Sequence, residues 1–125
     1  MPKNLPKIAD SEWRIMKLFW KKSPQTSEDI IDQLKDSIHW NPKTVKTLLN
    51  RLVKKGALDY DKEGRIYLYY PLVDEKKCVG AESRSFLNRV YDGALQPMLT
   101  AFLEEEKLSK NEIRELKRIL EEKRK

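Results

Sequence analysis

The segment NPKTVKTLLNRLVKKG, residues 41–56, concentrates five basic side chains and contains no acidic one. Lysine and arginine neutralise backbone phosphates, and threonine and asparagine hydrogen-bond to the base edges of a duplex. If the segment is helical, a rotation of about 100° per residue turns its polar side chains away from its apolar ones. The residue types therefore predict contact with nucleic acid, against the plainer alternative of a solvated surface face. The polar face consists of Lys43, Lys46, Thr47, Asn50, Arg51 and Lys54.

Local signals at both ends of this segment predict a helix from Pro42 to Lys55. Asn41 is a favourable N-cap, and Pro42 fits the first turn, where its missing N–H costs no hydrogen bond. Gly56 supplies the left-handed conformation that often ends a helix. The apolar side chains repeat at i, i+3, i+4 and i+7, which predicts one stripe buried in the core. This stripe consists of Val45, Leu48, Leu49 and Leu52.

The basic charge of the chain is unevenly distributed. The 125 residues have a formal net charge of +6, and residues 1–73 contain 14 Lys and Arg against 9 Asp and Glu. Residues 74–103 contain 4 of each sign, and residues 104–125 contain 8 basic against 7 acidic side chains. A basic excess that coincides with an ordered amphipathic helix is typical of nucleic-acid-binding domains.

Two helices are predicted before the basic one. Asp10 is expected to be the N-cap of the first, which runs to about Lys21, and Thr26 with Asp29 forms an acidic variant of the capping box at the start of the second. Two helices, a short connection and a basic third helix follow the order of a helix-turn-helix unit. The apolar side of the first helix contains Trp13, Met16 and Trp20, widened by Ile15, Leu18 and Phe19, and that of the second contains Ile30, Ile31 and Leu34.

Residues 58–72, LDYDKEGRIYLYYPL, read as two strands around a tight turn at Gly64. A hairpin directly after a recognition-type helix makes a winged helix, and its tip, residues 62–65, is expected to lie beside the DNA backbone. Thr44 and Thr47, near the helix N-terminus, are expected to read base edges or thymine methyls. The expected DNA-binding residues are Lys43, Thr44, Lys46, Thr47, Arg51, Lys54 and Arg65.

The C-terminal part has a different pattern, three amphipathic helices that begin near Asp74, Leu95 and Ser109, the last with a capping box at Ser109 and Glu112. About 50 residues of this kind are too few for an independent core, so we expect a second copy of the chain to cover their apolar stripes. The fold class is thus mainly α with a small β-hairpin: a winged helix-turn-helix in residues 1–73 and a helical dimerisation region in residues 74–125. The expected dimerisation residues are Leu95, Met98, Leu99, Phe102, Leu103, Ile113, Leu116, Ile119 and Leu120.

Few residues favour catalysis or metal binding. His39 is the only histidine and Cys78 the only cysteine, so neither a metal-ligand cluster nor an intramolecular disulfide is expected. With four glycines, the chain has no P-loop, no G-x-G-x-x-G and no G-x-S-x-G. We expect no cofactor, no enzymatic activity, no membrane insertion and a cytoplasmic location.

Several stretches together resemble the BlaI/MecI family of penicillinase and methicillin-resistance repressors. They are SEWRIMKLFW, WNPKTVKTLLNRLVKKGALDY, GRIYLYYPLV, SFLNRVY and LSKNEIRELKRIL. The resemblance covers about residues 8–120 and implies a dimeric winged-helix repressor on palindromic operators with TACA/TGTA-type half-sites. Repression of β-lactamase or penicillin-binding-protein genes is implied as well. The operator contacts of the family would map to Lys43, Thr44, Lys46, Thr47 and Arg51.

The resemblance also implies an inducing signal. Family members are inactivated when a membrane β-lactam sensor with a zinc-protease domain is activated, and cleavage falls in the dimerisation region, typically at an Asn-Phe bond. This chain has Ala101 and Phe102 at that place. The related copper-responsive CopY repressors carry a C-terminal cysteine cluster, which a single Cys78 cannot form, so copper sensing is disfavoured.

Two other functions remain open from the sequence. The chain could be a winged-helix regulator that responds to a small ligand in its helical half and is not cleaved. It could also be a protein-interaction module, since winged helices serve as scaffolds in larger complexes. A steep loss of affinity with salt distinguishes a DNA-binding protein from an apolar protein interface.

Overall fold

The computed structural model describes residues 5–124, and they form two compact units that divide between Ala81 and Glu82. The chain is mainly helical, with one antiparallel hairpin, as the sequence predicted. No helix in the described part of the chain is long and apolar enough to cross a membrane. The elements are α1 (Asp10–Lys21), α2 (Ser27–Leu34), α3 (Pro42–Lys54), β1 (Leu58–Glu63), β2 (Ile66–Pro71), α4 (Glu75–Tyr91), α5 (Leu95–Glu105) and α6 (Lys110–Lys123).

The predicted capping boxes at two helix starts are present. At α2 the Thr26 hydroxyl accepts a hydrogen bond from the Asp29 N–H at 3.1 Å, and the Asp29 carboxylate accepts one from the Thr26 N–H at 3.0 Å. At α6 the corresponding distances between Ser109 and Glu112 are 3.1 and 2.9 Å. Each box satisfies backbone N–H groups that have no partner inside the helix, so these helix starts are encoded locally.

The start of α1 differs from the prediction by one residue. Asp10 is the first helical residue, and Ala9 is the N-cap. The cause is Glu12, whose carboxylate accepts a hydrogen bond from the Ala9 N–H at 2.8 Å. This half of a capping box fixes the helix start one residue before Asp10, although alanine has no side chain that could complete the box.

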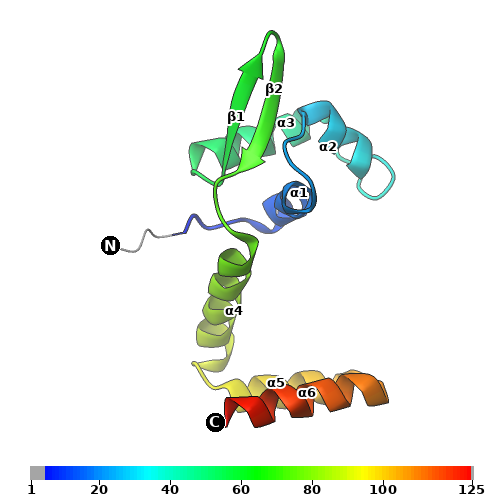
Figure 1. The fold of residues 1–125 in the computed structure, drawn as a ribbon, viewed down its shortest axis with the longest axis vertical. Helices are drawn as coiled ribbons and strands as arrows, with labels where there is room; N and C mark the ends of the chain where they lie inside the picture. The colour runs from blue at the N-terminus through cyan, green and yellow to red at the C-terminus, as the bar shows by residue number, and fades with distance from the viewer. Residues whose placement is uncertain (1–4, 125) are drawn as a thin grey trace. The chain divides into compact units, whose positions relative to one another are not determined.

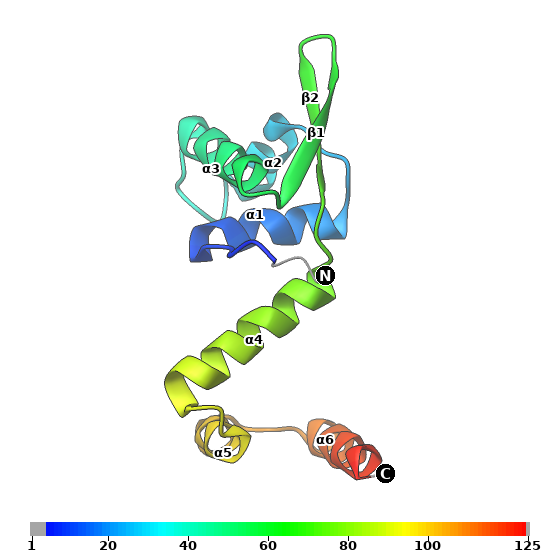
Figure 2. The same cartoon turned by 90° about the vertical axis from the view of Figure 1, so that its left-hand side faces the viewer.

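The core of the first unit lies between α1, α2, α3 and the hairpin (Figures 1 and 2). The predicted stripe of α3 is buried, and each leucine in it contributes about 1.5–3 kcal/mol through burial. In α1 the predicted stripe is shifted, because Trp13 and Trp20 lie half-exposed at the margin of the core. The largest fully buried apolar side chains are Ile15, Met16, Phe19, Ile30, Val45, Leu49, Leu52 and Leu58.

The two strands of the hairpin are joined by a two-residue turn. Leu58 pairs with Pro71 at one end and Glu63 with Ile66 at the other. Gly64 begins its turn with φ of +65°, a conformation that strains any residue with a Cβ. The hairpin follows α3 directly, and both views show it extending beyond the three helices (Figures 1 and 2). The first unit is therefore a winged helix, and we call β1, β2 and their turn the wing.

A loop residue that the sequence did not single out connects the wing to the helices. Gln25, between α1 and α2, forms an isolated antiparallel bridge with Tyr69 of β2 through two backbone hydrogen bonds of 3.0 and 2.8 Å. Its buried side-chain amide donates to the carbonyls of Leu18 and Lys22 at 3.0 and 2.6 Å, and accepts from Gln33 at 2.6 Å. One residue thus links α1, α2 and the wing, which fixes the wing relative to the helices.

Cys78 of α4 packs into the core of the first unit and is 4% exposed. Burial raises the pKa of its thiol, and the nearby negative charge of Asp74 raises it further. Because the thiolate is the reactive form, we expect the native chain at pH 8 to react with a chromogenic disulfide at least about tenfold more slowly than the chain in 6 M urea. Equal rates in the two states would contradict the buried position.

The elements of the second unit leave much apolar surface exposed. Asp74 caps α4 through a 3.1 Å hydrogen bond from the Lys77 N–H, and Gly93, with φ of +85°, follows the helix end. Within the second unit, the ring of Phe86 packs against Tyr91 and stacks on Phe102 of α5, with centroids 6.0 and 6.5 Å apart. Large apolar side chains of α5 and α6 that remain exposed are Leu95, Phe102, Leu103, Ile113, Leu116, Ile119 and Leu120.

Candidate nucleic-acid interface

The core fixes the rotation of α3, and this determines which of its side chains are exposed. Burial of the apolar stripe turns Lys43, Lys46, Thr47, Arg51 and Lys54 outward, and all five are exposed. Thr44 is half-buried at the edge of this face, as its helical position predicts. Five of the six candidate residues of the helix are therefore exposed, and Thr44 is partly exposed beside them.

The N-terminal turns of α3 also orient their two threonines. The Asn41 carboxamide oxygen accepts hydrogen bonds from the Thr44 N–H at 2.9 Å and from its hydroxyl at 3.2 Å. The Thr47 hydroxyl donates to the Lys43 carbonyl at 3.0 Å. Since both hydroxyl protons are engaged, the groups of each threonine that are left for other contacts are an acceptor oxygen and a methyl group. These groups suit an amino group or a thymine methyl in the major groove.

Four of the candidate residues meet at one hollow on this face. The hollow has a volume of about 300 Å³, and along α3 its two threonines lie between Lys43 and Arg51. The hollow therefore combines two hydroxyl groups with two cations, and such groups contact base edges and phosphates in protein–DNA complexes. The hollow is lined by Asn41, Lys43, Thr44, Thr47, Leu48 and Arg51.

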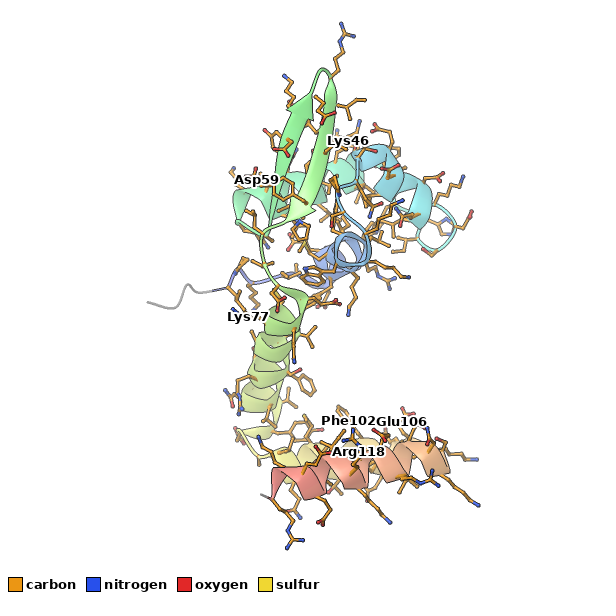
Figure 3. All side chains as sticks on the ribbon, in the orientation of Figure 1. Lys46, Asp59, Lys77, Phe102, Glu106 and Arg118 are labelled. Atoms are coloured by element: carbon orange, nitrogen blue, oxygen red, sulfur yellow. The ribbon has the colours of Figure 1, made fainter. Side chains whose placement is uncertain are left out.

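The other candidates lie beside this hollow rather than in it. Lys46 lies on the opposite flank of α3, next to the wing (Figure 3). It shares a groove with Arg65 of the wing tip. Lys54 borders a small hollow with Arg51 and Lys55. The sequence predicted a single polar face, whereas the structure divides it into a hollow on one side and a wing-side groove on the other.

Lys55 differs from the other basic residues of the segment. It is the C-cap of α3, not a helical residue as expected, and its ammonium lies 2.6 Å from a carboxylate oxygen of Glu12 and 2.8 Å from the Lys7 carbonyl oxygen. Glu12 is 1% exposed, whereas 31% of the Lys55 side chain is exposed, so the carboxylate is sheltered from water and the ammonium lies at the surface. The charge of Lys55 is compensated within the protein, and four of the five basic residues in this segment remain to meet phosphates.

The wing contributes side chains that the list of candidates omitted. Lys62 and Tyr67 are directly opposite in the hairpin register and line the same groove as Lys46. Alternation along the strands would have placed Tyr60, Lys62, Tyr67 and Tyr69 on one face. It could not have shown that this face is turned toward α3, because that depends on how the hairpin packs.

Among the described residues, no group of three or more His, Cys, Asp or Glu could hold a metal ion. His39 is exposed, and Cys78 is buried in the core. The bond between Ala101 and Phe102 lies inside α5, with Ala101 half-buried and Phe102 exposed. A protease binds an extended backbone, so this helix must unwind locally before the bond can be cleaved.

Comparison with known proteins gives consistent results over almost the whole chain. The family model described as penicillinase repressor matches residues 8–122. The penicillinase repressor of Bacillus licheniformis is 47% identical over 120 residues, which span 96% of this chain and 94% of the relative. The methicillin resistance regulatory protein MecI of Staphylococcus aureus is 39% identical over 116 residues, 93% of this chain and 94% of the relative.

Two solved structures match the winged helix. The solution structure of the DNA-binding domain of the repressor BlaI has a TM-score of 0.54 and 44% sequence identity, and the match covers 59% of this chain and 90% of that one. The monomeric form of Bacillus licheniformis BlaI, solved in complex with the blaP half-operator, has a TM-score of 0.53 at 44% identity. That match covers 60% of this chain and 92% of the BlaI chain.

Proposed function

The chain belongs to the penicillinase repressor family, and from this premise we propose that it binds an inverted-repeat operator as a homodimer and represses β-lactam resistance genes. It is a DNA-binding regulator and not an enzyme. The observation that supports this function best is the recognition-helix face, where exposed Lys43 and Arg51 flank Thr44 and Thr47. A relative with 44% identity binds a half-operator as a monomer, which supports one winged helix per half-site.

The proposed residue roles follow from the geometry of the interface. Lys43, Arg51 and Lys54 neutralise phosphates beside the major groove, and Thr44 and Thr47 contact base edges. Lys46 and Arg65 reach the backbone from the wing side. Each side chain makes a modest contribution, so one winged helix alone binds weakly and two together bind tightly.

We propose that residues 1–73 bind DNA and that residues 74–125 form the dimer. The exposed apolar side chains of α5 and α6 support this role, because isolated helices with bare apolar stripes are not stable in water. Met98 and Leu99 are half-buried and complete the proposed interface of α5. A second copy of the chain would cover these stripes with matching ones, as twofold symmetry requires.

Proteolysis is proposed as the signal that relieves repression. Cleavage between Ala101 and Phe102 would remove Phe102, Leu103 and α6 from the half of the dimerisation region attached to the DNA-binding unit. Each winged helix would stay folded, but the two would no longer be held together. A membrane β-lactam sensor with protease activity would supply the cleavage.

A direct test removes single cations from α3. Lys43→Ala and Arg51→Ala are each expected to weaken operator binding about five- to tenfold and to reduce the magnitude of the salt slope by about 1. Both side chains are exposed, so melting temperatures should change by no more than about 2 °C. Fluorescence anisotropy at several salt concentrations measures the binding, and circular dichroism measures the melting.

The matched control is Lys110→Ala, which removes the same charge from an exposed position on α6. It should leave operator affinity within about twofold of the parent chain. If Lys43→Ala and Arg51→Ala behave like this control, the basic face of α3 is ordinary solvated surface. A chain whose binding is insensitive to salt would instead favour a protein-interaction module.

A further inference from the structure

A groove of about 660 Å³ separates the wing from the helices. It lies on the side of α3 away from the hollow that contains Thr44 and Thr47. Three elements provide its polar side chains: Ser27 and Glu28 at the start of α2, Lys46 and Asn50 on α3, and Lys62 and Arg65 on the wing. We call it the wing groove.

One wall of the wing groove is preorganised by aromatic packing. In the hairpin register Tyr60 is opposite Tyr69 and Lys62 is opposite Tyr67, so all four side chains share one face. The rings of Tyr60 and Tyr67 stack with centroids 4.6 Å apart and planes within 3° of parallel. Tyr69 is buried and anchors this face on Phe19 of the core, with centroids 6.3 Å apart.

The same packing restrains the cation at the wing. The Lys62 ammonium lies 5.7 Å from the centroid of the Tyr67 ring, within range of a cation–π interaction. A lysine held against a ring loses less conformational freedom on binding an anion than a free lysine does. Lys62 is thus positioned at the groove, and Lys46 lines the same groove from α3.

Glu28 is the one acidic residue among the described residues that line the wing groove. It lies in the first turn of α2, and the Ser27 hydroxyl donates a hydrogen bond to its carboxylate at 3.2 Å. The charge of Glu28 also affects Tyr69, which lines the same groove. The pKa of Tyr69 is raised mainly by burial, next by Tyr60 and Tyr67, and also by Glu28. A carboxylate in this position repels any anion that Lys46 and Lys62 attract.

The position of the groove indicates what anion it receives. A helix that fills a major groove has a sugar–phosphate strand along each flank. The wing groove lies along one flank of α3, and three of its six polar side chains are cationic. A strand of the operator backbone would therefore pass over it.

We propose that the wing groove receives a backbone phosphate of the DNA, bound by Lys46 and Lys62, and that Glu28 weakens this contact. The inference rests on the proposed DNA-binding function and adds to it a residue that lowers affinity. Backbone contacts do not distinguish sequences, so Glu28 lowers the affinity for all DNA. Its effect is to keep the chain from being held on unrelated sequences and to leave discrimination to α3.

Two full-length variants with opposite expected effects test the proposal. Lys62→Gln should weaken binding to both the operator and an unrelated duplex about three- to fivefold, and Glu28→Gln should strengthen both by a similar factor. Asp32→Asn and Lys35→Gln are the matched controls, since they make the same charge changes on an exposed ion pair at the end of α2 that does not line the groove. Anisotropy titrations at several salt concentrations measure all five proteins.

A series of duplexes, each with a single half-site and one uncharged methylphosphonate linkage, then locates the contact. At one position along the backbone, neutralising the phosphate should abolish the effects of both Lys62→Gln and Glu28→Gln. If the parent chain binds no DNA in a salt-dependent way, the proposed function itself fails. If it does bind but both variants match their controls, or Glu28→Gln weakens binding, the inference about the wing groove is overturned.

Discussion

Replacing Leu116 and Leu120 by glutamate is expected to lower the affinity for an inverted-repeat operator about 10²- to 10⁴-fold. Both side chains lie on the apolar stripe of α6, and Leu120 is 58% exposed in the single chain. If a second copy covers this stripe, each glutamate places a charge in an apolar interface and the dimer dissociates. Affinity for a single half-site should stay within about threefold of the parent chain, because the winged helix is untouched.

Gln96→Glu with Asn111→Glu is the control for this double variant, since it changes the charge by the same amount at exposed positions outside the stripes. Sedimentation velocity gives the oligomeric state, and anisotropy on full and half operators gives the affinities. A fragment ending at residue 100 should behave like the Leu116 and Leu120 variant. If the double variant stays dimeric, or the parent chain is a monomer that binds the operator equally well, the avidity mechanism is wrong.

Lys55→Met is expected to destabilise the winged helix by about 3 kcal/mol, the lower end of the range for breaking a buried ion pair, because Lys55 is 31% exposed. The substitution leaves the carboxylate of Glu12 buried, with the Ala9 N–H as a remaining partner. Glu12→Leu combined with Lys55→Met should recover part of this loss, since two packed apolar side chains need no compensating charge, but the hydrogen bond from the Ala9 N–H to Glu12 is lost. Urea unfolding at one fixed chain concentration measures the free energies.

Lys54→Met is the control for the ion pair, because Lys54 is the exposed neighbour of Lys55 and makes the same change in charge. It should alter the free energy of unfolding by no more than about 0.5 kcal/mol. A coupling energy near zero between Glu12 and Lys55 in the double-mutant cycle would show that the contact does not contribute to stability.

Much of the fold is predictable from the sequence because its signals are local. The caps at Thr26, Asn41 and Ser109 each use atoms within three residues along the chain, so no knowledge of packing is needed to identify them. The periodicity of α3 correctly predicted its buried stripe, and Gly64 correctly marked the hairpin turn. These features together predicted the winged helix.

The features that were missed depend on contacts between distant residues. The Glu12–Lys55 pair joins residues 43 positions apart. The bridge from Gln25 to Tyr69 joins a loop to a strand far along the chain. No periodicity or capping rule identifies such partners before the elements are packed.

The candidate interface was also predictable only in part. The exposed residues of α3 follow from helix geometry once the buried stripe is known, so Lys43, Thr47 and Arg51 could be chosen in advance. The wing groove could not, because it exists only where α2, α3 and the hairpin come together. Glu28 in particular has no sequence signal beyond its place in the first turn of α2, which is a common position for an acidic residue.

The bridge at Gln25 has a consequence for the order in which the domain acquires its structure. A two-stranded hairpin is marginally stable by itself. Here β2 has a partner outside the hairpin, and Gln25 can provide it only after its amide is held by the carbonyls at the end of α1. We therefore expect the hairpin to become stable only after the helices have assembled, and in the folded domain Gln25 covers part of the β2 edge that could otherwise pair with another chain.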